Sequence, residues 1–111
     1  MTRVYELMVI IDTDTDDATV RETIERVGEL VTAEQGRVAT TDDWGRRKYA
    51  YPINKKSEGY YVVFEIVTDA ANLDETARYL RLADQVVRHK IMRLPDSEAA
   101  RRGLLSADDA A

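Results

Sequence analysis

The chain has 111 residues, a formal net charge of −5 and no cysteine. This length favours one domain with a single hydrophobic core, and the absence of thiols excludes disulfides and thiolate metal sites. With His89 as the only histidine, zinc enzymes and histidine-based triads are disfavoured. No apolar run approaches the roughly 20 residues of a membrane span, and Glu6 interrupts the N-terminal apolar stretch where a signal peptide would be continuous. We therefore expect a soluble cytoplasmic protein with no membrane association.

The first third of the chain predicts a strand followed by a helix. Apolar residues alternate over 3–11, with the odd-numbered positions from 5 onward as the better core face. Four aspartates in the loop 12–17 supply N-cap candidates. Apolar residues at helical spacing between 17 and 34 predict a helix with one apolar stripe. We expect Gly36 to end this helix by taking the left-handed cap conformation.

The middle of the chain predicts two strands joined by a turn. The first runs over about 37–53 and is interrupted by the sequence TTDDWG. Because Pro52 cannot donate a hydrogen bond to a neighbour, this strand is expected at an edge of the sheet. A polar turn follows at 54–59. The apolar and aromatic run 60–67 then predicts a central strand whose even-numbered residues face the core.

The last third predicts a short helix and a final strand. Asn72 and Glu75 have the spacing of a capping box and mark the start of the helix. The final strand is expected at 86–94. Two charges cannot be buried unpaired in a core, so Arg88 and Lys90 should face away from the helices.

The order strand, helix, strand, strand, helix, strand predicts an α+β, ferredoxin-like fold. This is a four-stranded antiparallel sheet with two helices packed on one face. We expect the domain to cover residues 1–95 and a small, polar, flexible or partly helical tail to cover 96–111. The uncovered sheet face would be apolar, and such a patch usually marks a contact surface. The residues expected to contact a protein partner there are Val4, Met8, Ile10, Tyr61 and Val63.

Catalysis and metal binding find little support in the sequence. Carboxylates are plentiful, but no spacing suggests a paired acid and base. The loop DTDTDD lacks the central glycine and closing glutamate of a calcium site. His89 is better explained as a residue at the edge of the core, and there is no glycine-rich phosphate loop. We therefore predict that the chain is not an enzyme and has no cofactor, metal or small-molecule substrate.

The segment 42–56 concentrates positive charge and aromatic rings on an acidic chain. Arginine and lysine contact phosphates, and aromatic rings stack on unpaired bases, so this pattern favours RNA binding. On the alternative interpretation, the tyrosines pack on neighbouring strands and the lysines keep a sheet edge soluble. The expected RNA-binding residues are Arg46, Arg47, Lys48, Lys55 and Lys56, with Arg3, Arg88 and Lys90 extending the surface.

Two other uses of the same fold stay open at this point. The run EGYYVVF approaches the RNP1 pattern of an RNA-recognition motif, which would make the chain a free-standing module that binds single-stranded RNA. The run has Glu58 where that pattern wants a basic residue, and the first strand offers no convincing RNP2 partner. A ligand-sensing or small-enzyme domain would need a pocket with convergent polar groups, and fold alone cannot choose between these classes.

Four segments carry a resemblance to a known family: YELMVI, DWGRRKYAYPINK, GYYVVFEI and RLADQVVRHKIMR. With them the chain resembles the bacterial small-subunit ribosomal protein number six family over nearly its whole length. The resemblance implies a structural role in the cytoplasmic ribosome, binding central-domain (platform) RNA of the small subunit as a pair with ribosomal protein number eighteen. The motif positions carried over are Trp44, Gly45, Arg46, Arg47, Ala50, Tyr51, Pro52 and Lys55. The chain departs from the family mainly in its tail.

Overall fold

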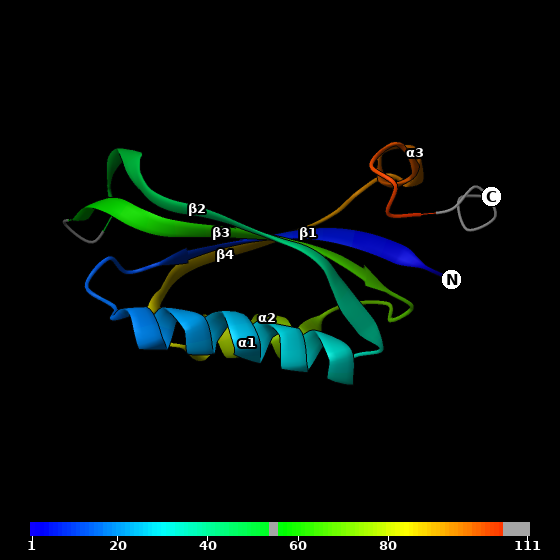
Figure 1. Ribbon diagram of the computed structural model, residues 1–111, viewed down its shortest axis with the longest axis horizontal. Coiled ribbons are helices and arrows are strands. Elements are labelled where there is room, and N and C mark those ends of the chain that lie inside the picture. The colour runs from blue at the N-terminus through cyan, green and yellow to red at the C-terminus, as the bar shows by residue number, and fades with distance from the viewer. Residues whose placement is uncertain (54–55, 106–111) are drawn as a thin grey trace.

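A computed structural model of the chain is shown in Figure 1. It describes the backbone of residues 1–53 and 56–105 and the side chains of 1–48 and 58–105. The elements in chain order are β1 (Arg3–Ile11), α1 (Asp17–Ala33), β2 (Gly36–Ile53), β3 (Lys56–Thr68), α2 (Asp74–Leu82), β4 (Val86–Arg93) and α3 (Asp96–Arg101). Among the described residues, no helix has the length and apolar character needed to cross a membrane.

The four strands form one sheet in the order β2-β3-β1-β4, and each neighbouring pair is antiparallel. Helices α1 and α2 lie together on one face of this sheet (Figure 1). The predicted ferredoxin-like arrangement is therefore confirmed. The position of β2 at the edge also confirms the expectation drawn from Pro52, since an edge strand has one row of backbone groups without a strand partner.

The main core lies between α1, α2 and the sheet. Alternate residues of β1 and β3 point into it, as the period-2 pattern predicted. Burying a valine, leucine, isoleucine or phenylalanine side chain there stabilises the fold by roughly 1.5–3 kcal/mol. The buried members are Tyr5, Leu7, Val9, Ile11, Val20, Val27, Val31, Val62, Phe64, Ile66, Leu73 and Leu80.

Strand β2 is continuous where the sequence predicted an interruption. Its register against β3 shifts between Val38 and Thr40 and again between Asp43 and Gly45. Each shift adds one unpaired residue, as a β-bulge does, so the polar run stays in the sheet. Gly45 has a φ of +72° at the second bulge, in the left-handed region that glycine tolerates without strain.

The end of α1 differs from the prediction in one detail. The left-handed residue is Gln35, with a φ of 64°, and not Gly36. Gly36 begins β2 opposite Thr68, where an added Cβ would lie 2.9 Å from the Thr68 Cβ. The glycine is therefore required by a close approach between strands rather than by its own dihedral angle.

The predicted capping box at the start of α2 forms only in part: Asn72 Oδ1 accepts a hydrogen bond from the Asp74 amide at 3.2 Å, while the Glu75 amide is bonded from the end of α1. Leu73 occupies the N-cap position and makes no side-chain cap bond. Glu34, just after α1, instead accepts hydrogen bonds from the backbone amides of Glu75 (2.8 Å) and Thr76 (3.3 Å). It also accepts one from the Thr76 hydroxyl at 2.7 Å. A carboxylate at a helix N-terminus is favourable for the helix dipole, and here it ties α1 to α2.

The C-terminal segment lies on the sheet face opposite α1 and α2 (Figure 1). The sequence predicts a flexible or partly helical tail from residue 96, and the structure describes residues 96–101 as α3 and residues 102–105 as packed beside it. The backbone amide of Leu94 donates to the carbonyl of Val4 at 2.9 Å. Four residues form a second buried cluster separate from the main core, namely Val4, Leu94, Ala99 and Leu105.

Candidate nucleic-acid interface

The β2–β3 hairpin extends past the start of α1, away from the helices (Figure 1). We call residues 43–48 and 58–61 of this hairpin, whose side chains the structure describes, the basic arm. The sequence folds this way because long paired strands need no helix behind them when their side chains are polar and solvated. Register fixes the faces of the arm, since directly paired residues point to the same side.

An aromatic pair lies at the base of the arm. Trp44 stacks on Tyr61 across the strands, with ring centroids 6.1 Å apart and planes 9° from parallel. The Trp44 Nε1 donates a hydrogen bond to Asp42 Oδ2 at 2.9 Å. The indole is still 41% exposed. It therefore braces the strand and also presents an aromatic surface to a binding partner.

Asp43 in the arm and Asp42 beside it bind neutral donors. Asp43 accepts a hydrogen bond from the Gly45 amide at 2.9 Å, which supports the bulge. Its other oxygen accepts a very short hydrogen bond from the Tyr60 hydroxyl. That bond, helped by partial burial, raises the pKa of Tyr60 to about 12. Among the described residues, Asp42 and Asp43 thus form no ion pair with Arg46, Arg47 or Lys48.

The cations of the arm face solvent. Arg46, Arg47 and Lys48 are all exposed, and their partners across the hairpin are Tyr60, Gly59 and Glu58. Arg46 and Lys48 thus lie on the helix side of the hairpin and Arg47 on the other. Among the described residues, none of these three side chains makes an ion pair or a hydrogen bond. Such a two-sided cationic strand suits a phosphate backbone better than it suits a single carboxylate.

The structure brings only some of the other expected RNA-binding residues near the arm. We call the sheet face opposite α1 and α2 the open face. Arg88 is exposed on this face beside Ile10, close to the arm end of the sheet. Lys90 lies on the same face, two residues further along β4 and away from the arm. Arg3 is seven residues from Ile10 on β1, roughly 23 Å away at the rise of a strand. Its Nη1 donates to the Ala70 carbonyl at 3.3 Å, so the structure does not group it with the arm.

Two hairpin lysines cannot be placed in the same way. Lys55 and the side chain of Lys56 lie outside the described residues. The carried-over motif positions Ala50, Tyr51 and Pro52 are described only as backbone of β2.

The apolar side chains of the open face are less exposed to solvent than the sequence predicted. Ile10 is 3% exposed and Val63 is 8% exposed, while Met8 and Tyr61 are half-buried. Val4 is 1% exposed because it packs in the C-terminal cluster, which removes it from the expected partner surface. The face instead shows Met92, which pairs with Glu6 and is 46% exposed. The sequence pattern could have indicated Met92, which has the parity of Arg88 and Lys90.

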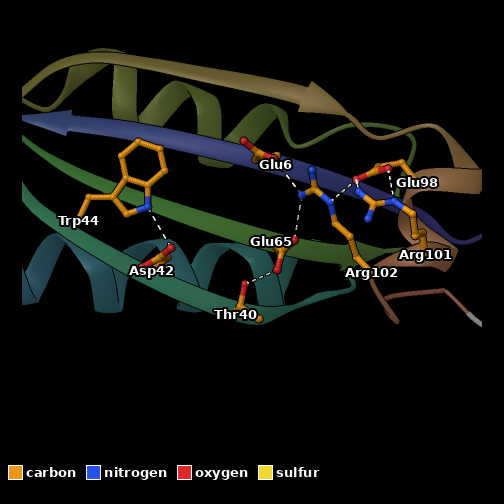
Figure 2. Close-up of polar contacts among 8 residues, drawn as sticks. All are labelled: Glu6, Thr40, Asp42, Trp44, Glu65, Glu98, Arg101 and Arg102. Atoms are coloured by element: carbon orange, nitrogen blue, oxygen red, sulfur yellow. Dashed lines mark hydrogen bonds and ion pairs between the residues drawn. The ribbon is translucent and has the colours of Figure 1, made fainter.

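Sequence reasoning also missed Arg102, which bridges the open face and α3 (Figure 2). Its Nη1 lies 3.1 Å from Glu6 Oε2 and 3.0 Å from Glu65 Oε2. Its Nε lies 2.8 Å from Glu98 Oε1. Hydrogen bonds from Arg101 and Arg102 lower the pKa of Glu98 to about 2. These contacts join β1, β3 and α3, and beside them is a pocket of about 240 Å³ lined by Glu6, Thr40, Asp42, Trp44, Val63, Glu65 and Arg102.

The remaining titratable candidates have structural roles. His89 pairs with Val9 on the helix face, and burial together with the charge of Arg81 lowers its pKa. In the aspartate loop, Asp16 caps α1 by accepting from the Thr19 amide at 2.7 Å. Across the part of the chain that is described, no three His, Cys, Asp or Glu side chains are arranged to hold a metal ion.

Residues 4–93 match the family model described as "Ribosomal protein S6". A small ribosomal subunit protein bS6 of Corynebacterium efficiens is 44% identical over 92 residues, which are 83% of this chain and 97% of that protein. One of Micrococcus luteus is 46% identical over 82% of this chain and 90% of that protein. The crystal structure of 30S ribosomal protein S6 from Thermotoga maritima superposes with a TM-score of 0.83 at 30% identity, covering 93% of this chain and 97% of that one.

Proposed function

Because this chain belongs to the ribosomal protein S6 family, whose members are structural, non-enzymatic parts of the small ribosomal subunit, we propose that its basic arm binds ribosomal RNA. The RNA is that of the central domain, or platform, of the small subunit in the cytoplasmic ribosome. The observation that carries this proposal is the set of exposed cations Arg46, Arg47 and Lys48, which form no ion pair among the described residues, although Glu58 lies opposite Lys48 in the register. Lys55 and Lys56 extend the same basic sequence toward the turn.

The physics of this contact is mainly electrostatic. Cations on both sides of a narrow hairpin can neutralise phosphates on either side of an RNA groove, and each contact releases counterions. Recognition would follow RNA shape more than base sequence, as for helical RNA in general. The exposed part of Trp44 adds a stacking surface for an unpaired base. The net charge of −5 does not oppose this, since the local field of the arm decides the approach.

We place the protein partner, ribosomal protein number eighteen, on the open sheet face. Met8, Tyr61 and the exposed Met92 supply the apolar contacts, with Ile10 and Val63 beneath them. Arg88 and Lys90 lie on the same face and can serve either the partner or the RNA. This surface differs from the expected one in the loss of Val4 and the gain of Met92.

Co-sedimentation with the small subunit tests the role, and two matched variants test the partner surface. Met92→Asp places a charge on the open face, whereas Leu82→Asp places one on α2, where Leu82 is 66% exposed. We expect Met92→Asp to weaken pairing with ribosomal protein number eighteen by about tenfold or more, and Leu82→Asp to leave it unchanged. Equal pairing by both variants would remove the open-face assignment. Failure of the unaltered chain to sediment with small subunits would contradict the role itself.

A further inference from the structure

The segment 94–105, which we call the C-terminal strap, covers one end of the open face (Figures 1 and 2). Its apolar residues Leu94, Ala99 and Leu105 bury Val4 in a cluster separate from the main core. The strap also lies beyond residues 4–93, the part that matches the family model. The match to the Thermotoga maritima structure, which covers 93% of this chain, extends into the strap.

Besides the apolar cluster, a salt-bridge network joins the strap to β1 and β3. Glu6 and Glu65 are directly opposite each other on β1 and β3, and like charges in that position repel. Arg102 contacts both carboxylates at 3.1 and 3.0 Å. The strap thus provides the cation that contacts both carboxylates.

The strap has few means of staying ordered without the sheet. Helix α3 spans only Asp96–Arg101, and its N-cap residue Pro95 makes no side-chain cap bond. A helix this short does not persist in water without tertiary contacts. Segments held by a small apolar cluster and exposed ion pairs open at lower free energy than the core does.

We propose that the C-terminal strap undocks as a unit while the main core stays folded, and that it gates the Val4 end of the open face. Undocking uncovers Val4 beside two carboxylates that have lost their cation. The occupant that fits this surface in place of the strap is a segment of another protein that carries an arginine flanked by small apolar and leucine side chains. That is the chemistry of the strap itself.

Thiol labelling can measure strap opening, because the chain has no cysteine of its own. Val4 and Val9 lie on the same strand and are each 1% exposed, but Val9 faces the main core. We expect Val4→Cys to react with a maleimide at least about tenfold faster than Val9→Cys under native conditions. Adding Arg102→Ala should accelerate only the Val4→Cys reaction. Arg101→Ala is the control, since among the described residues the Arg101 side chain bonds only to Glu98, within the strap itself.

Two results would contradict the proposal that the strap undocks. One is an equal, slow reaction of both cysteines, and the other is a rate ratio that Arg102→Ala leaves unchanged. The second part of the proposal uses the same readout with a synthetic peptide of residues 94–105. That peptide should slow labelling of the Val4→Cys, Arg102→Ala chain, and a peptide carrying the Arg102→Ala change should not. Equal effects of the two peptides, or no effect of either, would contradict docking by a segment from another chain. Neither measurement contains RNA or a partner protein, so its outcome is separate from that of the proposed function.

Discussion

Glu6 and Glu65 occupy directly opposed positions on β1 and β3, and a single guanidinium, that of Arg102, contacts both carboxylates. A like-charged pair across two strands is unfavourable alone, so this arrangement depends on a residue from the far end of the chain. The relationship couples the centre of the sheet to the C-terminal strap.

This coupling predicts that the effect of one substitution on the thermal midpoint has opposite signs in the presence and absence of Arg102. In the unaltered chain, Glu65→Gln weakens a contact to Arg102 and should lower the thermal midpoint by roughly 1–2 °C. After Arg102→Ala, the same change removes an uncompensated repulsion and should raise the midpoint by a similar amount. Scanning calorimetry of the four proteins measures both effects. A shift of the same sign in both backgrounds would contradict the network.

The Tyr60–Asp43 hydrogen bond predicts a stability change at high pH. Folding raises the pKa of Tyr60 from 10.0 to about 12, so the neutral phenol is favoured in the folded state. Its contribution is complete below pH 10.0 and is lost as the pH rises through about 12. In a tyrosinate titration followed at 295 nm, Tyr60→Phe should remove one group that ionises near 12, and Asp43→Asn should lower the pKa of Tyr60. An unchanged high-pH step in both variants would show that the bond does not form in solution.

Substitutions at the neighbouring residues Gln35 and Gly36 should change the free energy of unfolding in opposite directions. Gly36→Ala would push a Cβ to 2.9 Å from Thr68 Cβ, and overpacking of this kind costs about 1–3 kcal/mol. Gln35→Gly relieves a left-handed φ of 64° and should stabilise the fold by about 0.5–1 kcal/mol. Urea unfolding gives both values. Destabilisation by Gln35→Gly would show that the side chain outweighs the strain of its backbone.

The fold could be predicted because its signals are local. Alternation in β1 and β3, helical spacing in α1 and the proline of β2 each act over a few residues. The contacts that the sequence did not reveal join residues distant in the chain: Glu34 caps α2 from the end of α1, and Arg102 reaches Glu6 on the first strand. No single-chain pattern specifies such partners.

For the tail, a local signal was present but weak. Asp96 and Glu98 in the first turn and Arg101 in the last turn of α3 have the charge order of a helix. The candidate RNA-binding residues of the hairpin are indicated by the concentration of positive charge and aromatic rings in one segment, and by the family resemblance. Their alternation between the two sides of the hairpin follows from the period of a strand, whereas the side that each residue takes depends on the register, which the bulges of β2 set.

The basic arm is tested most directly by the salt dependence of RNA affinity. Arg46→Ala with Arg47→Ala removes two cations from the arm, and Arg21→Ala with Arg78→Ala removes two exposed cations from α1 and α2. Binding of each protein to a central-domain RNA fragment would be measured over a series of salt concentrations, with thermal midpoints as the check on folding. We predict that the arm variant binds about tenfold more weakly and shows a log–log salt slope smaller by roughly 1–2, while the control matches the unaltered chain and all midpoints agree. An arm variant with unchanged affinity and slope would contradict RNA binding by the arm.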